Sequence, residues 1–293
     1  MADFSSAAIN KRATQGAFVS PKEIVISGKT AIFTGANTGI GFECCSQLLD
    51  LRLGRLIMAV RSLPKGEEAK QQLFLQADLA SYDSITAFVD YATTLDRLDI
   101  VINNAGVCKK SFALDPKTSH EKSIRVNYLG SAQCIPAELR FSSDTPTWAP
   151  FKEKDSVPLL TAFDKPQSFK FQDRYATSKL LGQLFLRELA KHMPSLVVVI
   201  NAPNSGTVVG YAARSMQFLI ALDASVGARA LVDAAVNHGP TSQGQYVEDG
   251  KVVPMASFVY QPRGKAITKQ LWQETMAELR FAGVEVFIRK VRK

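Results

Sequence analysis

TAIFTGANTGIGFECCSQLLDL, at residues 30–51, is the stretch of sequence that decides the fold. Its first five residues are apolar or β-branched, which is typical of a buried strand. Three closely spaced glycines follow: Gly35, Gly39 and Gly41. From residue 39 onward the apolar positions recur at the spacing of a helix. The order of strand, glycine-rich turn and helix is the opening unit of an α/β domain.

The same alternation continues along the chain. Short apolar runs that predict further strands lie at residues 56–60, 73–76, 99–103 and 196–201. Segments compatible with helices lie at roughly 39–52, 81–96, 118–138, 173–193, 224–237 and 265–282. Continuous apolar strands that alternate with helices indicate a parallel sheet covered on both faces. We therefore expect an α/β fold, a Rossmann-type doubly wound parallel β-sheet in a single domain.

Nothing in the composition divides the chain into separate domains. We expect an N-terminal extension at residues 1–27, a nucleotide-binding Rossmann domain at 28–260, and a C-terminal helix with a basic tail at 261–293 that packs on the same domain. The region from about 141 to 172 contains four prolines and is poor in helix signal. It should be irregular, and it precedes the helix predicted at 173–193, where a long loop can line a substrate pocket.

The bulk composition is that of a soluble globular protein. Apolar residues make up 46% of the chain and charged residues 21%, so the chain can bury a large core. The formal net charge is +8, but the basic residues are scattered, except for Arg289, Lys290, Arg292 and Lys293. We interpret these four residues as a solvated tail and expect no nucleic-acid partner.

Targeting and cysteine patterns point to the inside of the cell. The first twenty residues lack the apolar core of a secretory signal, and no apolar run is long enough to span a bilayer. The four cysteines are Cys44, Cys45, Cys108 and Cys134. They form no CxxC pair and do not have the spacing of zinc ligands. We expect free thiols, no metal site, no membrane span and a cytoplasmic location.

The glycine turn is also a candidate phosphate site. Glycine permits a tight turn and close approach of the backbone, and the following helix N-terminus offers free N–H groups and a positive dipole end. The residues that we expect to bind the pyrophosphate of a dinucleotide are Gly35, Asn37, Thr38, Gly39, Ile40 and Gly41. A tight turn without a ligand is the alternative.

Two positions after the next predicted strands concern the adenosine end of such a ligand. Arg61 follows the run at 56–60, where a Rossmann fold meets the adenosine ribose. A guanidinium can pair with a 2′-phosphate, so Arg61 favours NADP(H), although it could also be a solvent-facing loop residue. Asp78 and Leu79 follow the run at 73–76, and Asp78 could either bind adenine or cap the next helix.

Small and amide residues close the fourth predicted strand. Asn104, Ala105 and Gly106 follow Asn103 directly after the run at 99–103, and their small size would let the backbone approach a cofactor. Paired asparagines after a buried strand are costly unless they bond to backbone groups. Contact with the ligand and bracing of the neighbouring strands are therefore both open.

A tyrosine and a lysine form the candidate catalytic pair. Tyr175 and Lys179 are four residues apart in a helix-compatible segment, which places both side chains on one helical face. A phenol is a poor proton donor or base at neutral pH unless a neighbouring cation stabilises the phenolate. The ammonium of Lys179 would supply that cation, so Tyr175 is the candidate acid or base.

Taken in order, five motifs resemble those of the short-chain dehydrogenase/reductase family. They are TGANTGIG at 34–41, DLAS at 78–81, NNAG at 103–106, VNYLG at 126–130 and YATSK at 175–179. The resemblance covers roughly residues 28 to 260 and is nearest to retinol-dehydrogenase-like reductases and to reductases of fungal secondary metabolism. It implies a single-domain oxidoreductase that uses a nicotinamide cofactor, and Arg61 makes NADP the expected one.

The resemblance also assigns roles to individual residues. Tyr175 would be the acid or base, Lys179 would bind the nicotinamide ribose, and Asn127 would position a relay water. Ser143 would polarise the substrate carbonyl, with Ser142 as the alternative. Hydride would pass between the cofactor and a carbonyl or alcohol of a small apolar metabolite. Relatives often pair through the helices predicted at 118–138 and 173–193, so a homodimer is possible.

The sequence departs from the family pattern between two of these residues. Only 16 positions separate Asn127 from Ser143, fewer than the family usually has, and the segment 138–141 is a poor substitute for a buried central strand. The stretch from Arg61 to Asp78 is also short. Two hypotheses follow: an active NADP(H)-dependent enzyme, or a catalytically impaired relative that binds the nucleotide without turnover.

Two further features concern the pocket. The loop after the run at 196–201 reads Asn204-Ser205-Gly206, where the family usually has Pro-Gly. Large apolar residues in the flanking segments favour a bulky apolar substrate, with plain core packing as the alternative; they are Phe141, Trp148, Phe151, Tyr211, Met216 and Phe218.

Overall fold

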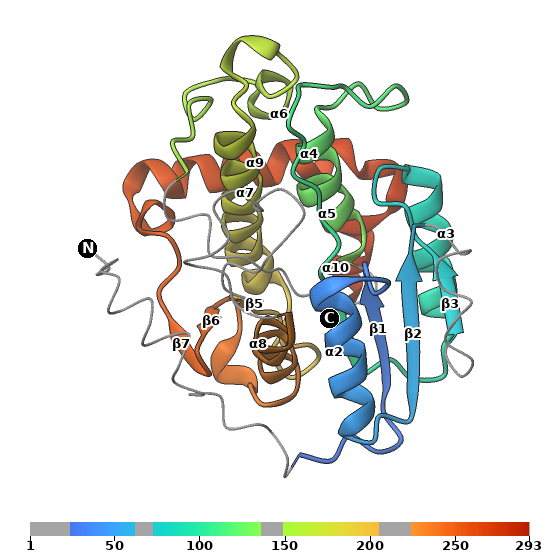
Figure 1. The fold of residues 1–293 in the computed structure, drawn as a ribbon. Helices are drawn as coiled ribbons and strands as arrows, with labels where there is room; N and C mark the ends of the chain where they lie inside the picture. Colours follow the sequence, from blue (N-terminus) through green and yellow to red (C-terminus); the bar gives the residue numbers. More distant parts are fainter. Residues whose placement is uncertain (1–23, 62–72, 136–148, 205–223, 293) are drawn as a thin grey trace.

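The computed structural model describes residues 24–61, 73–135, 149–204 and 224–292, which form one α/β unit (Figure 1). The strands are β1 (Thr30–Thr34), β2 (Arg55–Val60), β3 (Leu73–Gln76), β4 (Ile100–Asn103), β5 (Ala202–Pro203), β6 (Tyr246–Glu248) and β7 (Lys251–Val253). The α-helices are α2 (Gly39–Asp50), α3 (Tyr82–Thr93), α4 (Lys122–Ile124), α5 (Ser131–Gln133), α6 (Leu159–Ala162), α7 (Phe171–His192), α8 (Ala224–Val236), α9 (Pro262–Glu278) and α10 (Val284–Val291). A π-helix, η2 (Arg125–Gly130), joins α4 to α5.

A parallel sheet forms the first half of the molecule. Its strand order is β3-β2-β1-β4, and Ile32 of β1 lies between Ile57 of β2 and Val101 of β4. Every residue of β1 is buried, because helices cover both faces of the sheet. Phe33 packs in the cluster that includes α2 and α8, whereas Ile32 faces the cluster that includes Phe88 of α3. The predicted fold class, with a parallel sheet and helices on both faces, is confirmed.

A second, smaller sheet has the order β5-β6-β7, with β5 parallel to β6 and β6 antiparallel to β7. Helix α8 contacts both β4 and β5, so it spans the two sheets. Within the residues that the structure describes, no strand pairs with the free edge of β4 or with that of β5. Among the described residues, packing of α8 therefore joins the two sheets.

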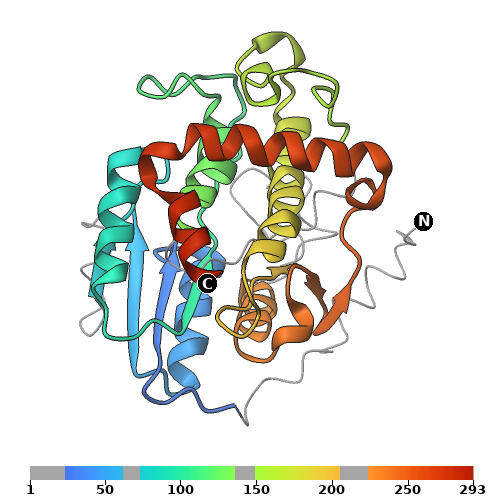
Figure 2. The same cartoon turned by 180° about the vertical axis from the view of Figure 1, so that it is seen from behind.

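Helices α7 and α9 enclose the main apolar core. The α4–η2–α5 run and α7 lie side by side, and α9, drawn in red, crosses over both of them (Figure 2). Aromatic contacts connect η2, α7 and α9. The ring centroids of Tyr128 in η2 and Phe185 in α7 are 5.8 Å apart, and those of Phe185 and Trp272 in α9 are 5.2 Å apart. No helix in the described ranges is both long enough and apolar enough to cross a bilayer.

Most of the predicted elements were placed well, but one strand was wrong. Residues 196–201 form no strand, and the strand begins only at Ala202. Leu196 and Val197 are 94% and 56% exposed, so the start of this run is not buried between neighbouring strands, whereas Ile200, near its end, is 2% exposed. Strands β6 and β7 were not predicted, because each is only three residues long.

Two helix predictions also need correction. The helix predicted at 118–138 starts at Lys122, because the Asp115 carboxylate accepts the backbone N–H of Thr118 in a turn and Glu121 is the N-cap. The helix predicted at 265–282 is α9, which starts at Pro262, a favourable first helical residue.

The described basic residues at the C-terminus are exposed as predicted, but Arg289 and Lys290 lie on a helix and not in a tail, and Lys293 lies outside the described residues. Gly283 adopts φ +64°, which ends the preceding turn, and the chain then forms α10. Val284 and Ile288 of α10 are buried in the main core, whereas Arg289 and Lys290 are exposed on its outer side. An amphipathic helix thus presents to solvent basic residues that the sequence analysis had placed in a tail.

Candidate active site

Helix α7 presents the predicted catalytic pair on one face. The Lys179 Nζ lies 5.6 Å from the centroid of the Tyr175 ring, and both side chains are half-buried. Their neighbours Ala176, Thr177 and Ser178 are buried, which fixes the rotation of the helix about its axis. The four-residue spacing therefore produces the expected neighbouring phenol and ammonium.

Asn127 lies beside this pair, in the π-helix η2. Its side-chain Nδ2 donates to the carbonyl of Val107 at 2.8 Å and to the Ser178 hydroxyl at 3.0 Å. Its Oδ1 accepts the N–H of Val107 at 2.7 Å. Asn127 is 4% exposed, so these bonds satisfy an amide that would otherwise be costly to bury. Asn127 thereby joins the loop after β4 to the helix that carries Tyr175.

The Thr34 hydroxyl adds side-chain bonds between the paired ends of β1 and β4. Thr34 Oγ1 donates to Asn103 Oδ1 at 2.7 Å and accepts the N–H groups of Asn104 and Ala105, each at 3.1 Å. The Nδ2 of Asn104 also donates to the Thr34 carbonyl at 3.4 Å. Both side-chain amides thus brace the neighbouring strand, which is one of the two roles that the sequence left open for them.

Close backbone contact explains the glycines of this edge. Gly35 adopts φ +70°, and a Cβ there would lie 3.0 Å from the Cα of Ala105. A Cβ at Gly41 would lie 2.2 Å from the carbonyl oxygen of Gly35, a distance that no side chain tolerates. The glycine turn therefore packs directly on itself and on the loop after β4.

Gly106 joins the turn to the catalytic pair. A Cβ at Gly106 would lie 3.2 Å from the Asn127 Oδ1 and 3.6 Å from the Lys179 Nζ. The exposed backbone of Gly106 thus lies next to the lysine ammonium. The glycine turn, the loop after β4 and the α7 pair share the carboxyl-end edge of the sheet, which is where ligands bind in open α/β sheets.

The N-terminus of α2 fits a phosphate group. Its N-cap, Thr38, makes no side-chain capping bond, and the first turn of α2 carries no acidic residue. Thr38 and Gly39 are exposed, while Asn37 and Ile40 are partly buried. No side chain of the N-cap residue therefore binds the first N–H groups of α2, and these groups form the positive end of the helix dipole. These residues fit the pyrophosphate that the sequence analysis expected.

The residues predicted for the adenosine end lie along the same edge. Arg61 is exposed immediately after β2. Asp78 Oδ1 accepts the N–H of Ala80 at 3.0 Å, and Leu79 is buried. Asp78 is not the cap of α3, since Ser81 is the N-cap and its hydroxyl accepts the N–H of Ser84 at 3.3 Å. The capping alternative for Asp78 is therefore wrong.

Several expected pocket residues do not fall within the structure as described. Ser142 and Ser143 lie outside the described residues, and so do Phe141, Trp148, Tyr211, Met216 and Phe218. Phe151 is 2% exposed and packs in the main core, so its assignment to the pocket is wrong. In the loop after β5, Asn204 donates to the Glu248 carboxylate at 2.7 Å, and Ser205 and Gly206 lie outside the described residues.

Three residues that position the site were not predicted from the sequence: Thr34, Arg174 and Ser178. Thr34 and Ser178 have roles that depend on partners far along the chain, and no local pattern indicates them. Arg174, the residue before Tyr175, is 3% exposed and pairs with Glu153 at 3.2 Å. Burial lowers the pKa of Arg174, and the Glu153 carboxylate opposes that shift. An arginine directly before the catalytic tyrosine was the only available signal.

Comparison with known proteins agrees with this geometry. The model of the short chain dehydrogenase family matches residues 29–147. The short-chain dehydrogenase fogG of Aspergillus ruber is 39% identical over 94% of this chain and 93% of its own length. The short chain dehydrogenase/reductase mfmJ of Annulohypoxylon moriforme is 36% identical over 93% of this chain and 90% of its own length.

Solved structures share the fold at low sequence identity. An uncharacterised protein of Mycobacterium paratuberculosis has a TM-score of 0.67 at 23% identity, over 90% of this chain and 97% of that chain. A 3-oxoacyl-(acyl-carrier-protein) reductase of Agrobacterium tumefaciens, with NADP bound, has a TM-score of 0.60 at 15% identity, over 80% and 97%. Because fungal relatives align along nearly the whole chain, and because the glycine turn, Asn127 and the Tyr175/Lys179 pair meet at one edge, the protein belongs to the short-chain dehydrogenase/reductase family of oxidoreductases.

Proposed function

We propose that the protein is an NADP(H)-dependent oxidoreductase that interconverts a carbonyl and an alcohol on a small apolar metabolite. The observation that carries the proposal is the position of Gly106, whose backbone adjoins both the Lys179 ammonium and the Asn127 amide. This contact places the proton-transferring pair next to the loop that follows the nucleotide-binding turn. A carbonyl seated there would meet Tyr175 on one side and the nicotinamide on the other.

The cofactor site would be built from backbone and small side chains. The residues proposed to bind NADP(H) are Gly35, Asn37, Thr38, Gly39, Ile40, Gly41, Arg61, Asp78, Leu79, Asn104, Ala105, Gly106, Tyr175 and Lys179. When bound, NADPH supplies the hydride that reduces the carbonyl carbon. The exposed guanidinium of Arg61, at the end of β2, supports a preference for the 2′-phosphate of NADP(H) over NAD(H).

The protein's own residues would move the proton. In reduction the Tyr175 hydroxyl donates its proton to the carbonyl oxygen, and in oxidation the phenolate takes the proton from the alcohol. The Lys179 ammonium stabilises the phenolate and donates to the nicotinamide ribose. The Asn127 amide already makes three bonds to Val107 and Ser178, which supports a role in positioning the loop against α7.

The substrate is proposed to be an apolar secondary metabolite of polyketide type. The two most similar relatives described above come from fungi and are named as short-chain dehydrogenases. An aromatic pair supports an apolar pocket, since Phe112 and Phe169 meet edge to face with centroids 5.7 Å apart. Phe112 lies in the loop after β4, and Phe169 lies two residues before the start of α7, so each is close in sequence to an element of the site. Apolar side chains with few polar groups are typical of small-molecule pockets.

A second candidate is a relative that binds the nucleotide without turnover. In the described part of the chain no strand lies between β4 and β5, and Asn127 is only 16 positions before Ser143. The catalytic serine that the family resemblance implies would follow such a strand. This observation favours the second candidate, whereas the Tyr175/Lys179 pair favours the first.

Binding and turnover measurements separate the two candidates. We expect NADPH fluorescence to change on binding at micromolar protein, with weaker NADH binding, and NADPH to be consumed with bulky apolar ketones or aldehydes. Tyr175→Phe should lower kcat by about 100-fold or more while binding of NADPH is retained. Tyr91→Phe, on α3 away from the site, is the matched control. NADPH binding with no consumption across a carbonyl panel would select the second candidate, and no dinucleotide binding would reject both.

A further inference from the structure

The segment from residue 149 to 169, called here the bridging segment, leads directly into α7, which begins at Phe171. Its only regular structure is the four-residue helix α6 and one 3₁₀ turn at Pro166–Ser168. Helices this short are not stable by themselves. The conformation of the bridging segment must therefore come from contacts with other parts of the protein.

One side of α9 supplies these contacts. Arg263 donates to the carbonyl of Lys154 at 3.1 Å and pairs with the Asp155 carboxylate. Gln270 Nε2 donates to the carbonyl of Ser156 at 3.0 Å. Glu274 follows Gln270 by one helical turn, so its side chain points to the same side of α9. The anchors thus follow the bridging segment in order along its length.

Glu274 caps α6 from outside the segment. Its Oε1 accepts the N–H of Leu159 and its Oε2 accepts the N–H of Leu160, both at 2.8 Å. The N-cap of α6 is Pro158, whose side chain cannot accept a hydrogen bond. The carboxylate therefore satisfies two N–H groups at the positive end of the short helix.

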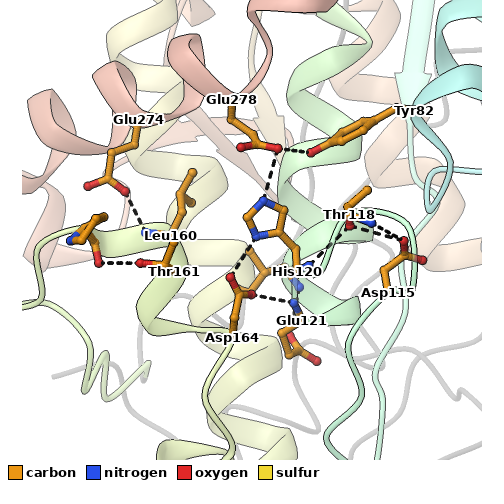
Figure 3. Close-up of polar contacts among 12 residues, drawn as sticks. Tyr82, Asp115, Thr118, His120, Glu121, Leu160, Thr161, Asp164, Glu274 and Glu278 are labelled. Atoms are coloured by element: carbon orange, nitrogen blue, oxygen red, sulfur yellow. Dashed lines mark hydrogen bonds and ion pairs between the residues drawn. The ribbon is translucent and has the colours of Figure 1, made fainter.

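Glu278, one turn further along α9, acts through a histidine (Figure 3). His120 Nδ1 lies 3.1 Å from Asp164 Oδ2, and His120 Nε2 lies 3.3 Å from Glu278 Oε1. Burial alone would lower the pKa of His120, but the bonds to Asp164 and Glu278 outweigh it and raise the pKa to about 9. Glu278 also accepts the Tyr82 hydroxyl at 2.7 Å. A charged imidazolium thus joins α9 to Asp164 of the bridging segment.

The bridging segment in turn contacts the start of both catalytic helices. Asp164 Oδ1 accepts the N–H of Glu121 at 2.8 Å, and the Glu121 carboxylate accepts the N–H of Ile124 in α4 at 3.1 Å. Helix α4 continues into η2, which carries Asn127. At the other helix, Arg174 pairs with Glu153 and lies 4.8 Å over the ring of Phe163. The starts of α4 and α7 therefore both contact the bridging segment, which α9 anchors.

We propose that Glu274 and Glu278 of α9 are positioning residues for the reaction: by anchoring the bridging segment, they fix the start of α7, and hence Tyr175, relative to Asn127. Their effect on turnover rests on the proposed function, whereas their effect on the first turn of α7 does not. Neither carboxylate contacts the glycine turn, which lies at the N-terminus of α2. Their loss should therefore change the proton-transferring side of the site and leave dinucleotide affinity unchanged.

Amide hydrogen exchange with turnover kinetics tests the proposal on the full-length protein. In Glu274→Ala we expect faster exchange at Leu159 and Leu160 and at the first turn of α7, where the N–H of Arg174 bonds to the carbonyl of Lys170 at 2.8 Å. We expect kcat to fall about 10-fold with the Kd for NADPH unchanged. Glu274→Gln retains one acceptor oxygen and should give intermediate values in both measurements. Glu285→Ala, which removes an exposed carboxylate of α10, is the matched control.

The outcomes separate this proposal from the proposed function. Wild-type exchange at the first turn of α7 in a folded Glu274→Ala protein would overturn it, whether or not the enzyme is active. Faster exchange with unchanged kcat would also overturn it, because the anchor would then be structural only. If the wild-type protein binds NADPH but turns nothing over, the proposed function fails, and the exchange at α7 alone decides the positioning. If Glu274→Ala does not fold, Glu274→Gln replaces it in the same comparison.

Discussion

The Asn127 amide donates to the Ser178 hydroxyl at 3.0 Å, across 51 residues of sequence. Ser178 in turn donates to the backbone carbonyl of Tyr175 at 2.7 Å. This pair is the direct polar link between the π-helix η2 and the helix that carries Tyr175 and Lys179. It explains why the side chain of Ser178, which lies between Tyr175 and Lys179 in the sequence, is fully buried.

Ser178→Ala should misplace the catalytic pair without preventing folding. Asn127 Nδ2 keeps its bond to the Val107 carbonyl, but the substitution removes the bond from Asn127 and the bond to the Tyr175 carbonyl, so the loss of two neutral hydrogen bonds should cost about 2 kcal/mol of unfolding free energy. We expect kcat to fall about 10-fold, because Tyr175 loses its fixed position relative to Asn127. Urea unfolding and steady-state kinetics measure the two effects. Ser46→Ala, an exposed serine of α2, is the control, and equal kinetics in both variants would refute the role of Ser178.

Arg61→Ala should change the choice of dinucleotide. Loss of a charge-assisted bond to the 2′-phosphate should weaken NADPH binding by about 10-fold to 100-fold and leave NADH binding nearly unchanged. Titration of the variant and the wild-type protein with each dinucleotide measures the ratio of the Kd for NADPH to the Kd for NADH. Lys29→Ala removes an exposed charge just before β1, at the opposite end of the sheet, and controls for the overall charge. Equal loss for both dinucleotides would show that Arg61 does not read the phosphate.

His120 predicts a fall in stability at alkaline pH. Its pKa is raised from 6.5 to about 9, so its contribution is fully present below about pH 6.5 and is lost as the pH rises through 9. At ~1.4 kcal/mol per pKa unit, and allowing for partial relaxation, the loss should be on the order of 2 kcal/mol. Urea unfolding at pH 6, 7.5 and 9.5 should show this decline in the wild-type protein and a flatter profile in His120→Gln.

The carboxylate partner of His120 supplies the second arm of that test. Glu278 has a lowered pKa, chiefly because of the bond to His120, so its contribution is present at neutral pH and is lost as the pH falls through its folded value. Glu278→Gln should therefore lose stability at neutral pH and reduce the alkaline decline, since Asp164 alone remains to bind the imidazolium. An alkaline decline of wild-type size in Glu278→Gln would show that Glu278 does not act on His120.

Helix α9 should prevent dimerisation through the face that the sequence suggested for it. Trp272 stacks on Phe185 of α7, and Thr275 Oγ1 lies 2.6 Å from the Tyr128 hydroxyl of η2. These contacts occupy the surface that α7 and η2 would offer to a second copy. We expect a monomer at micromolar concentration by light scattering. A dimer whose crosslinks map to α7 and η2 would contradict this expectation.

Local signals accounted for most of the first sheet. The apolar run before Gly35 became β1, and the predicted helix at 39–52 became α2 with the same start, because a continuous buried run and a glycine turn are visible in a short window. The run at 196–201 failed for the opposite reason. Its apolar residues suit a strand, but the chain pairs with β6 only from Ala202 onward. Strand pairing depends on distant residues and not on the run itself.

The sequence by itself determined the α/β class and the glycine turn, and it supplied Tyr175, Lys179 and Asn127 as candidate site residues, because these features depend on residue type and on short motifs. Only the tertiary structure decided how these parts meet. Thr34 bonds to residues about seventy positions away, and Glu274 bonds to amides more than a hundred positions away. Such bonds form only after packing has brought distant segments together, so no periodicity in the sequence records them. The candidate residues of the site were therefore visible in the sequence, whereas the contacts that position them became visible only in the fold.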